Sequence, residues 1–106
     1  MTGGAGEDIQ GTIDRDAIRR VIQANLSSIR ACYNKELNKH PDLLGKLVLT
    51  WEIGEQGRVL KASTKSNELG DREVAECILA KLRTWRFPEP PANQVAEVSY
   101  PFFFSN

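Results

Sequence analysis

The first half of the chain carries one apolar stripe with helical spacing. Its members recur at steps of three or four residues, as on one face of an α-helix: Ile18, Ile22, Leu26, Ile29, Tyr33 and Leu37. Asp14 is a candidate N-cap, and Asp16 lies in the first turn, where the helix dipole favours a negative charge. Pro41 disfavours helical geometry in the residue before it, so the helix should end near Asn38. We predict one long amphipathic helix between Ile13 and Leu37.

A period-two alternation follows, which is typical of a half-buried strand. Its apolar members are Leu47, Leu49, Trp51 and Ile53. The glycines of Gly54–Gly57 predict a tight reversal, and a second strand runs from Arg58 to Thr64, so the two strands form a hairpin. Val59 and Ala62 cannot share a face by strict alternation. We therefore expect a bulge near Lys61.

The last third of the chain predicts a second helix and a final strand. Asp71 is its candidate N-cap, and apolar residues recur at helical spacing: Val74, Cys77, Ile78, Leu82 and Trp85. The proline-rich run 87–91 ends this helix. In the strand that follows, one face carries Ala96, Val98, Tyr100, Phe102 and Phe104. By this parity, the aromatic C-terminal run 100–104 is mainly a core strand and not a tip that inserts into a membrane.

These elements predict a two-layer α+β domain with the order α-β-β-α-β. Three strands would form an antiparallel or mixed sheet, with both helices packed on one face. A right-handed crossover would return the last strand parallel to the second strand and next to the first, which leaves the last strand at an edge. Residues 12–106 form this single domain. The glycine-rich residues 1–11 predict a flexible linker or an expression remnant.

Charge and composition exclude several classes of function. The chain has 14 basic and 14 acidic residues, and the basic ones are scattered, so it lacks the positive footprint of a nucleic-acid-binding protein. No apolar run approaches the ~20 residues that span a bilayer, and no signal-peptide pattern opens the chain. The sequence shows no nucleophile elbow or phosphate-binding glycine pattern, so we expect no enzyme and no cofactor.

Three residues that could take part in metal or ligand binding have simpler structural explanations. His40, the one histidine, has no neighbouring carboxylates or thiols in the pattern, so we expect a surface histidine and no metal site. Trp51 and Trp85 could stack on sugars or bases, but both fall on inward-facing positions, which favours core packing.

Cys32 and Cys77 leave two alternatives. They could be free, buried thiols that pack as small apolar residues. They could instead form a disulfide between the two helices, which requires an oxidising compartment. A redox-active pair is disfavoured, because there is no C-x-x-C motif and neither cysteine lies at a helix N-terminus.

A set of short motifs resembles a known family. The motifs are the Cys32–Tyr33 pair, I-G-x-x-G-x-V at 53–59, Cys77, W-R-F-P at 85–88 and Y-P-F-x-F at 100–104. Over residues 11–104 the chain resembles the C-terminal domain of AgmX/PglI-type gliding-motility proteins, which is similar to the TonB C-terminal domain. The resemblance implies a periplasmic domain at the end of an inner-membrane-anchored protein, in a compartment where a disulfide between Cys32 and Cys77 can persist.

The resemblance also implies a function. Such a domain is a non-enzymatic protein-interaction module that transmits force across the cell envelope, without inserting into the membrane itself. Its partner would be an outer-membrane or periplasmic protein of the same envelope machine. TonB binds its receptor by adding the receptor's strand to its own sheet, so we expect strand addition at the last strand here.

The last strand contains the residues that would carry this contact. If odd-numbered residues turn their backbone groups outward, Val95, Glu97 and Ser99 would pair with the partner, and Pro101, which lacks an N–H, would end the pairing. Glu97 and Pro101 could instead simply protect an exposed edge from aggregation. The alternative function is a structural envelope domain that dimerises or binds peptidoglycan without strand addition.

Overall fold

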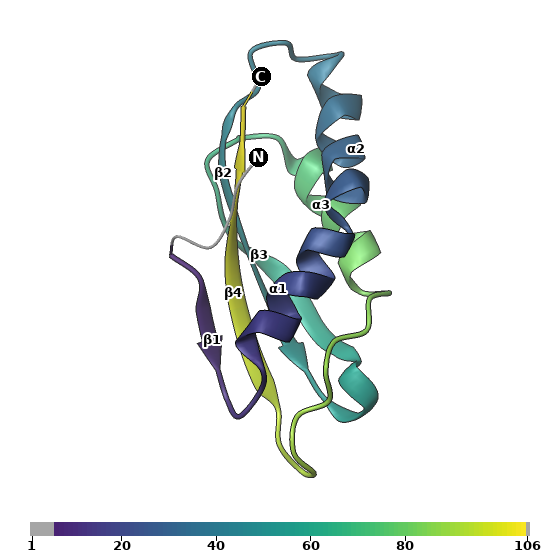
Figure 1. The fold of residues 1–106 in the computed structure, drawn as a ribbon. Coiled ribbons are helices and arrows are strands. Elements are labelled where there is room, and N and C mark those ends of the chain that lie inside the picture. The colour runs from purple at the N-terminus through teal and green to yellow at the C-terminus, as the bar shows by residue number, and fades with distance from the viewer. Residues whose placement is uncertain (1–5, 106) are drawn as a thin grey trace.

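The computed structural model describes residues 6–105, which fold into three α-helices and a four-stranded sheet (Figure 1). The elements in chain order are β1 (Asp8–Gln10), α1 (Arg15–Ala24), α2 (Leu26–Leu37), β2 (Gly45–Ile53), a short 3-10 turn (Glu55–Gly57), β3 (Val59–Asn67), α3 (Arg72–Leu82) and β4 (Ala96–Phe104). The α+β class of the sequence analysis is confirmed, and the predicted hairpin, second helix and final strand follow one another in the expected order.

The sheet has the order β1-β4-β2-β3, and every neighbouring pair is antiparallel. As predicted, β4 lies beside β2 and runs in the same direction as β3. The prediction of three strands is wrong, because Asp8–Gln10 adds a fourth strand to β4. These three residues belong to the segment 1–11 that we predicted to be a linker; residues 1–5 of that segment lie outside the described part of the chain.

The first helical region is two helices, where the pattern predicted one. Asn25 interrupts it with φ −111° and ψ 10°, which is not helical geometry. Its side-chain amide donates to the carbonyl of Val21 (2.8 Å), and its backbone N–H to that of Ile22 (3.0 Å). A short polar side chain can thus replace the helical hydrogen-bond pattern locally, which lets α1 and α2 take different directions (Figure 1).

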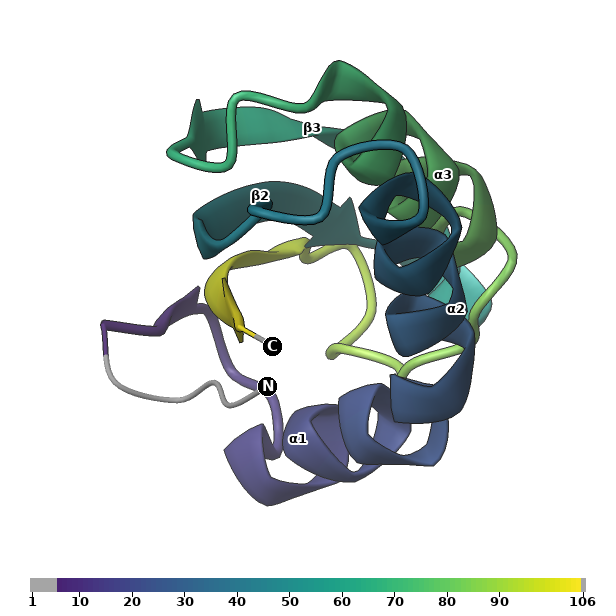
Figure 2. The ribbon, with the colours of Figure 1, turned by 90° about the horizontal axis from the view of Figure 1, so that it is seen from above.

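All three helices lie on one face of the sheet (Figure 2). The side chains of β4 alternate as predicted, with Ala96, Val98, Tyr100, Phe102 and Phe104 buried. Trp51 and Trp85 are both buried in the core, which confirms their assignment. The opposite face of the sheet is polar around Thr50 and Ser99, whose hydroxyl groups are 3.3 Å apart, so the protein has two layers.

The β2–β3 hairpin is irregular at two places. Its register shifts between Glu52 and Ile53, where Leu60 is the extra residue on β3, so the bulge predicted near Lys61 is confirmed. A second shift lies between Val48 and Leu49. At the hairpin turn, Gly57 has φ +72°, and its carbonyl accepts a hydrogen bond from the N–H of Phe87 (3.0 Å). A close backbone approach therefore joins the hairpin turn to the segment after α3.

Candidate functional site

The predicted binding residues lie on or beside β4. Glu97, Ser99 and Pro101 alternate along the strand with the buried residues of the helix-facing side, and Val95 precedes the strand with 47% of its surface exposed. Glu97 is exposed and Ser99 is partly exposed, whereas Pro101 is buried. The structure thus places Glu97, Ser99 and Pro101 on one strand with the side-chain parity that the sequence predicts, and Val95 directly before it.

The outer edge of β4 is not free along its whole length. Asp8, Ile9 and Gln10 of β1 lie opposite Ser99, Val98 and Glu97 respectively. The expectation that β4 is an open edge is therefore wrong for Glu97–Ser99. The sequence did not predict this strand, because the segment around it is rich in glycine. The one signal for it was the isolated apolar residue Ile9.

The chain holds β1 in place with few contacts. Ile9 is its buried side chain, with 6% of its surface exposed. From α1, the Arg15 guanidinium donates to the carbonyl of Ile9 (3.1 Å). Just before β1, Glu7 accepts a hydrogen bond from Nε of Arg19 (2.7 Å). The pairing with β4, one buried side chain and two arginines thus hold this strand in place.

The Arg19 pair brings charge close to β4. Nη1 of Arg19 also donates to Asp16 (2.7 Å). The pKa of Arg19 is raised mainly by its hydrogen bond to the Glu7 carboxylate and less by Asp16. Tyr100 lies near this group: burial, together with the charge of Glu7, raises the pKa of its phenol. A cluster formed by Glu7, Arg19 and Tyr100 therefore lies next to the β1–β4 pairing.

Beyond Ser99, β4 has no strand on its outer side within residues 6–105. The pairing with β1 stops two residues before Pro101, which cannot donate a backbone hydrogen bond. The backbone of Gly6 passes near the Pro101 ring, because a Cβ added at Gly6 would lie 4.0 Å from Cγ of Pro101. The proline thus lies just beyond the end of the β1–β4 pairing, while the pairing of β4 with β2 continues to Phe104.

The other edge of the sheet, β3, is less suited to strand addition. Its two register shifts distort the ladder, and Lys61 and Lys65 are exposed along it. The guanidinium of Arg83 donates to the carbonyl of Ala62 (3.2 Å), which occupies a backbone acceptor of this strand. Bulges, lysines and an occupied carbonyl are features that protect an edge from pairing.

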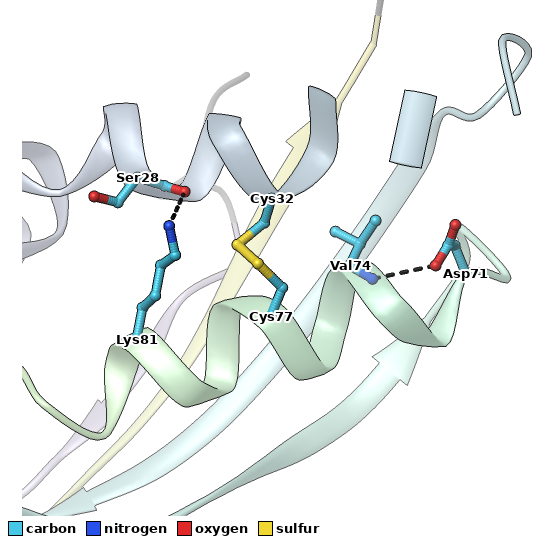
Figure 3. Close-up of a disulfide and its surroundings, with 6 residues drawn as sticks. All are labelled: Ser28, Cys32, Asp71, Val74, Cys77 and Lys81. Atoms are coloured by element: carbon cyan, nitrogen blue, oxygen red, sulfur yellow. Dashed lines mark hydrogen bonds between the residues drawn. A yellow bond between two sulfur atoms is a disulfide. The ribbon is translucent and has the colours of Figure 1, made fainter. Parts of the chain in front are cut away.

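Cys32 and Cys77 join α2 to α3 in a disulfide, with a Cα–Cα distance of 5.7 Å (Figure 3). The alternative of two free thiols is therefore wrong. One turn further along α3, the Lys81 ammonium donates to the carbonyl of Ser28 on α2 (3.3 Å). The disulfide and this hydrogen bond hold α2 and α3 together. Both lie in the helix layer, on the other side of the sheet from its polar face.

The structure also brings together three residues that the sequence did not predict to be neighbours, Glu36, His40 and Asp71. His40 is exposed, as expected, but Glu36 and Asp71 lie beside it, so the premise that it lacks neighbouring carboxylates is wrong. Glu36 and His40 are four residues apart at the end of a helix, which was a usable signal. Asp71 comes from the start of α3, and no local pattern predicts that proximity.

Comparisons with protein-family models, with curated proteins and with solved structures found no match to this chain. Within the described residues, no helix is long and apolar enough to cross a membrane. The candidate site is therefore defined by geometry: a β4 edge partly covered by the chain's own short strand.

Proposed function

We propose that this domain is a non-enzymatic protein-interaction module that binds an extended segment of a partner along β4, by strand addition. The observation that carries the proposal is the β1–β4 pairing itself. A three-residue segment from outside the hairpin and helices has been added, antiparallel, to Glu97–Ser99. The edge thus has the geometry to accept a strand, and a partner would take the place of β1 there.

Displacement of β1 breaks the contacts of one buried side chain, one ion pair and the backbone pairing of three residues. Burial of an isoleucine side chain contributes about 1.5–3 kcal/mol, and Ile9 is the one buried side chain of this strand. The ion pair of Arg19 with Glu7 adds to this: Arg19 is 39% exposed, so solvent screens the pair in part, and Glu7 is 10% exposed. A partner strand that forms more backbone hydrogen bonds, each worth a net ~0.5–1.5 kcal/mol, can therefore compete.

The site predicts the chemistry of the partner segment. An apolar residue should take the place of Ile9 opposite Val98, with polar residues on either side, because the two faces of this edge differ in polarity. The segment should pair with residues from Val95 to Ser99 and stop at Pro101. A partner segment that also pairs with Val95 would form a longer ladder than β1 does, because the three residues of β1 reach only as far as Glu97.

On the resemblance of its motifs, we propose a periplasmic location at the end of an inner-membrane-anchored protein of the gliding-motility type. The partner would then be an outer-membrane or periplasmic protein, and the domain would transmit force to it in the manner of TonB. The Cys32–Cys77 disulfide supports this location, because such bonds persist in oxidising compartments.

Site-specific photo-crosslinking in the intact cell envelope tests the proposal. A photoreactive residue at Val95 or Glu97 should crosslink to one outer-membrane or periplasmic protein, and the matched positions Lys61 and Lys65 on β3 should not. Crosslinks from β3 alone would contradict strand addition on β4. Crosslinks to a second copy of the chain, or to peptidoglycan, would support the structural-domain alternative.

A further inference from the structure

We propose that Glu36, His40 and Asp71 form a binding site for a divalent transition-metal ion, with Zn²⁺ as the best-matched ion. One ligand atom from each of the three side chains lies within 4.8 Å of the others. Two carboxylates and one imidazole are a donor set that zinc accepts at ~2.0–2.2 Å. The imidazole nitrogen disfavours Mg²⁺ and Ca²⁺, which prefer oxygen ligands.

Two of the three ligands are on well-fixed backbone. Glu36 lies in the last turn of α2, one turn after Cys32, whose disulfide to Cys77 ties α2 to α3. Asp71 is the N-cap of α3, where one carboxylate oxygen accepts from the N–H of Val74 (3.1 Å; Figure 3). Its second carboxylate oxygen is then available as a ligand. The same disulfide that clamps the helices therefore also fixes the separation of two carboxylates.

The third ligand supplies the adjustment that binding requires. Donor atoms bound to one tetrahedral ion at ~2.0–2.2 Å are about 3.3–3.6 Å apart, so donors near the 4.8 Å limit must move about 1 Å closer on binding. The His40 side chain is exposed and can turn, whereas its backbone is held by a hydrogen bond from its N–H to the carbonyl of Glu36 (2.9 Å). A rotation of the imidazole brings the third donor into range.

The burial of Glu36 favours a cation at this site. Its side chain is 7% exposed, and burial of a carboxylate is unfavourable without compensation. Among the residues that the structure describes, its one ion-pair partner is Lys39, at 3.5 Å, and Lys39 is 63% exposed. A solvent-exposed lysine compensates a buried carboxylate weakly. A divalent ion between Glu36 and Asp71 would do so directly.

The surroundings favour a cation and leave it accessible. The three residues border an open pocket in which the other charged side chains are Asp42, Glu73, Lys39 and Arg72. Four carboxylates therefore face two cationic groups, which gives the pocket a negative potential. Three protein ligands leave at least one coordination position for water or for a donor from another molecule.

Isothermal titration of ZnCl₂ into the untagged, oxidised chain tests the site. We expect one ion per chain, and at least about tenfold weaker binding in each of E36Q, H40A and D71N, since loss of even an indirect support for a ligand costs ~10–100-fold. Asn is a good N-cap, so D71N retains the cap of α3. The matched controls D42N and E73Q remove other carboxylates of the same pocket and should weaken binding much less than tenfold, because they change only the potential around the ion.

Binding that is absent, or that is unchanged in H40A and E36Q, would overturn the proposal. Equal weakening in the control variants would also overturn it, because it would indicate only general attraction to a negative pocket. Co²⁺ gives a second readout: its visible absorption should report a nitrogen-containing site in the wild type and lose that signature in H40A. The site does not depend on strand addition at β4, so either proposal can fail alone.

Discussion

Ile9 and Val98 lie opposite each other on β1 and β4, and both side chains are buried in the core beneath the helices. This contact joins a short N-terminal strand to the strand on which we propose a partner binds. It makes β1 both a part of the fold and a competitor for the binding edge. The strength of β1 binding should therefore control access to β4.

Replacement of Ile9 by Ala should weaken β1 selectively. The loss of buried surface should destabilise the native state by about 1–3 kcal/mol, at the lower end of core truncations, because β1 can detach without unfolding the rest. Amide hydrogen exchange should accelerate at those amides of Glu97–Ser99 that point toward β1 and remain slow in β2. The control is Leu44→Ala at a 60% exposed position, which should change neither quantity. Unchanged exchange in β4 would contradict the role of Ile9.

Gly57 and Gly70 form a matched pair that separates steric overlap from backbone strain. Both have positive φ, +72° and +73°, but a Cβ at Gly57 would lie 1.8 Å from the carbonyl oxygen of Phe87, and a Cβ at Gly70 would meet nothing within 4 Å. Gly70→Ala should destabilise by about 1 kcal/mol, the strain of the left-handed backbone alone. Gly57→Ala should lower the free energy of unfolding, measured in urea, by several times more than Gly70→Ala does. Equal losses would contradict the close approach of the hairpin turn to Phe87.

Removal of the disulfide should lower stability without changing the fold. The bond closes a loop of sequence separation 45, so the chain-entropy relation gives about 4 kcal/mol for its loss. Chemical denaturation of the Cys32→Ser, Cys77→Ser double variant measures this loss. The wild type in reductant should match the double variant. A loss below ~1 kcal/mol would show that Lys81 and the core hold α2 to α3 without the bond.

Tyr100 should make the protein less stable at alkaline pH. Burial, with the charge of Glu7, raises the pKa of the folded phenol, so above pH ~10 the unfolded chain releases this proton first and the folded state retains it. The free energy of unfolding should then fall as pH rises through that range. Tyr100→Phe should remove this part of the decline, as measured by urea unfolding at several pH values. An identical pH dependence in the variant would contradict the assignment.

Local patterns were enough to predict most of the fold. Asp71 as the cap of α3, the buried parity from Ala96 to Phe104 and the bulge beside Lys61 all follow from residues within a few positions of one another. The break at Asn25 was missed because the apolar stripe continues across it, and the end of α1 is visible only in the backbone angles and hydrogen bonds of Asn25.

The candidate sites depend on contacts that local patterns do not contain. β1 pairs with a strand almost 90 residues away in the sequence. A single apolar residue, Ile9, in a glycine-rich segment cannot show the alternation that predicts a strand. Glu36 and His40 are neighbours in sequence, but Asp71 reaches them only because the chain returns after the hairpin and the disulfide holds α3 against α2. Long-range packing therefore determines both the pairing of β1 with β4 and the proposed metal site.

The central claim is that a partner replaces β1 on β4. An engineered disulfide between Asp8→Cys and Ser99→Cys tests it most directly, because these residues lie opposite each other and such pairs have a Cα separation suited to a disulfide. The control lock joins Thr50→Cys to Ser63→Cys, an opposite pair on β2 and β3. The measurement is photo-crosslinking from Val95 to the partner in the intact envelope. We predict that the β1–β4 lock abolishes the crosslink and that the β2–β3 lock preserves it; a crosslink of equal yield in both would contradict strand exchange.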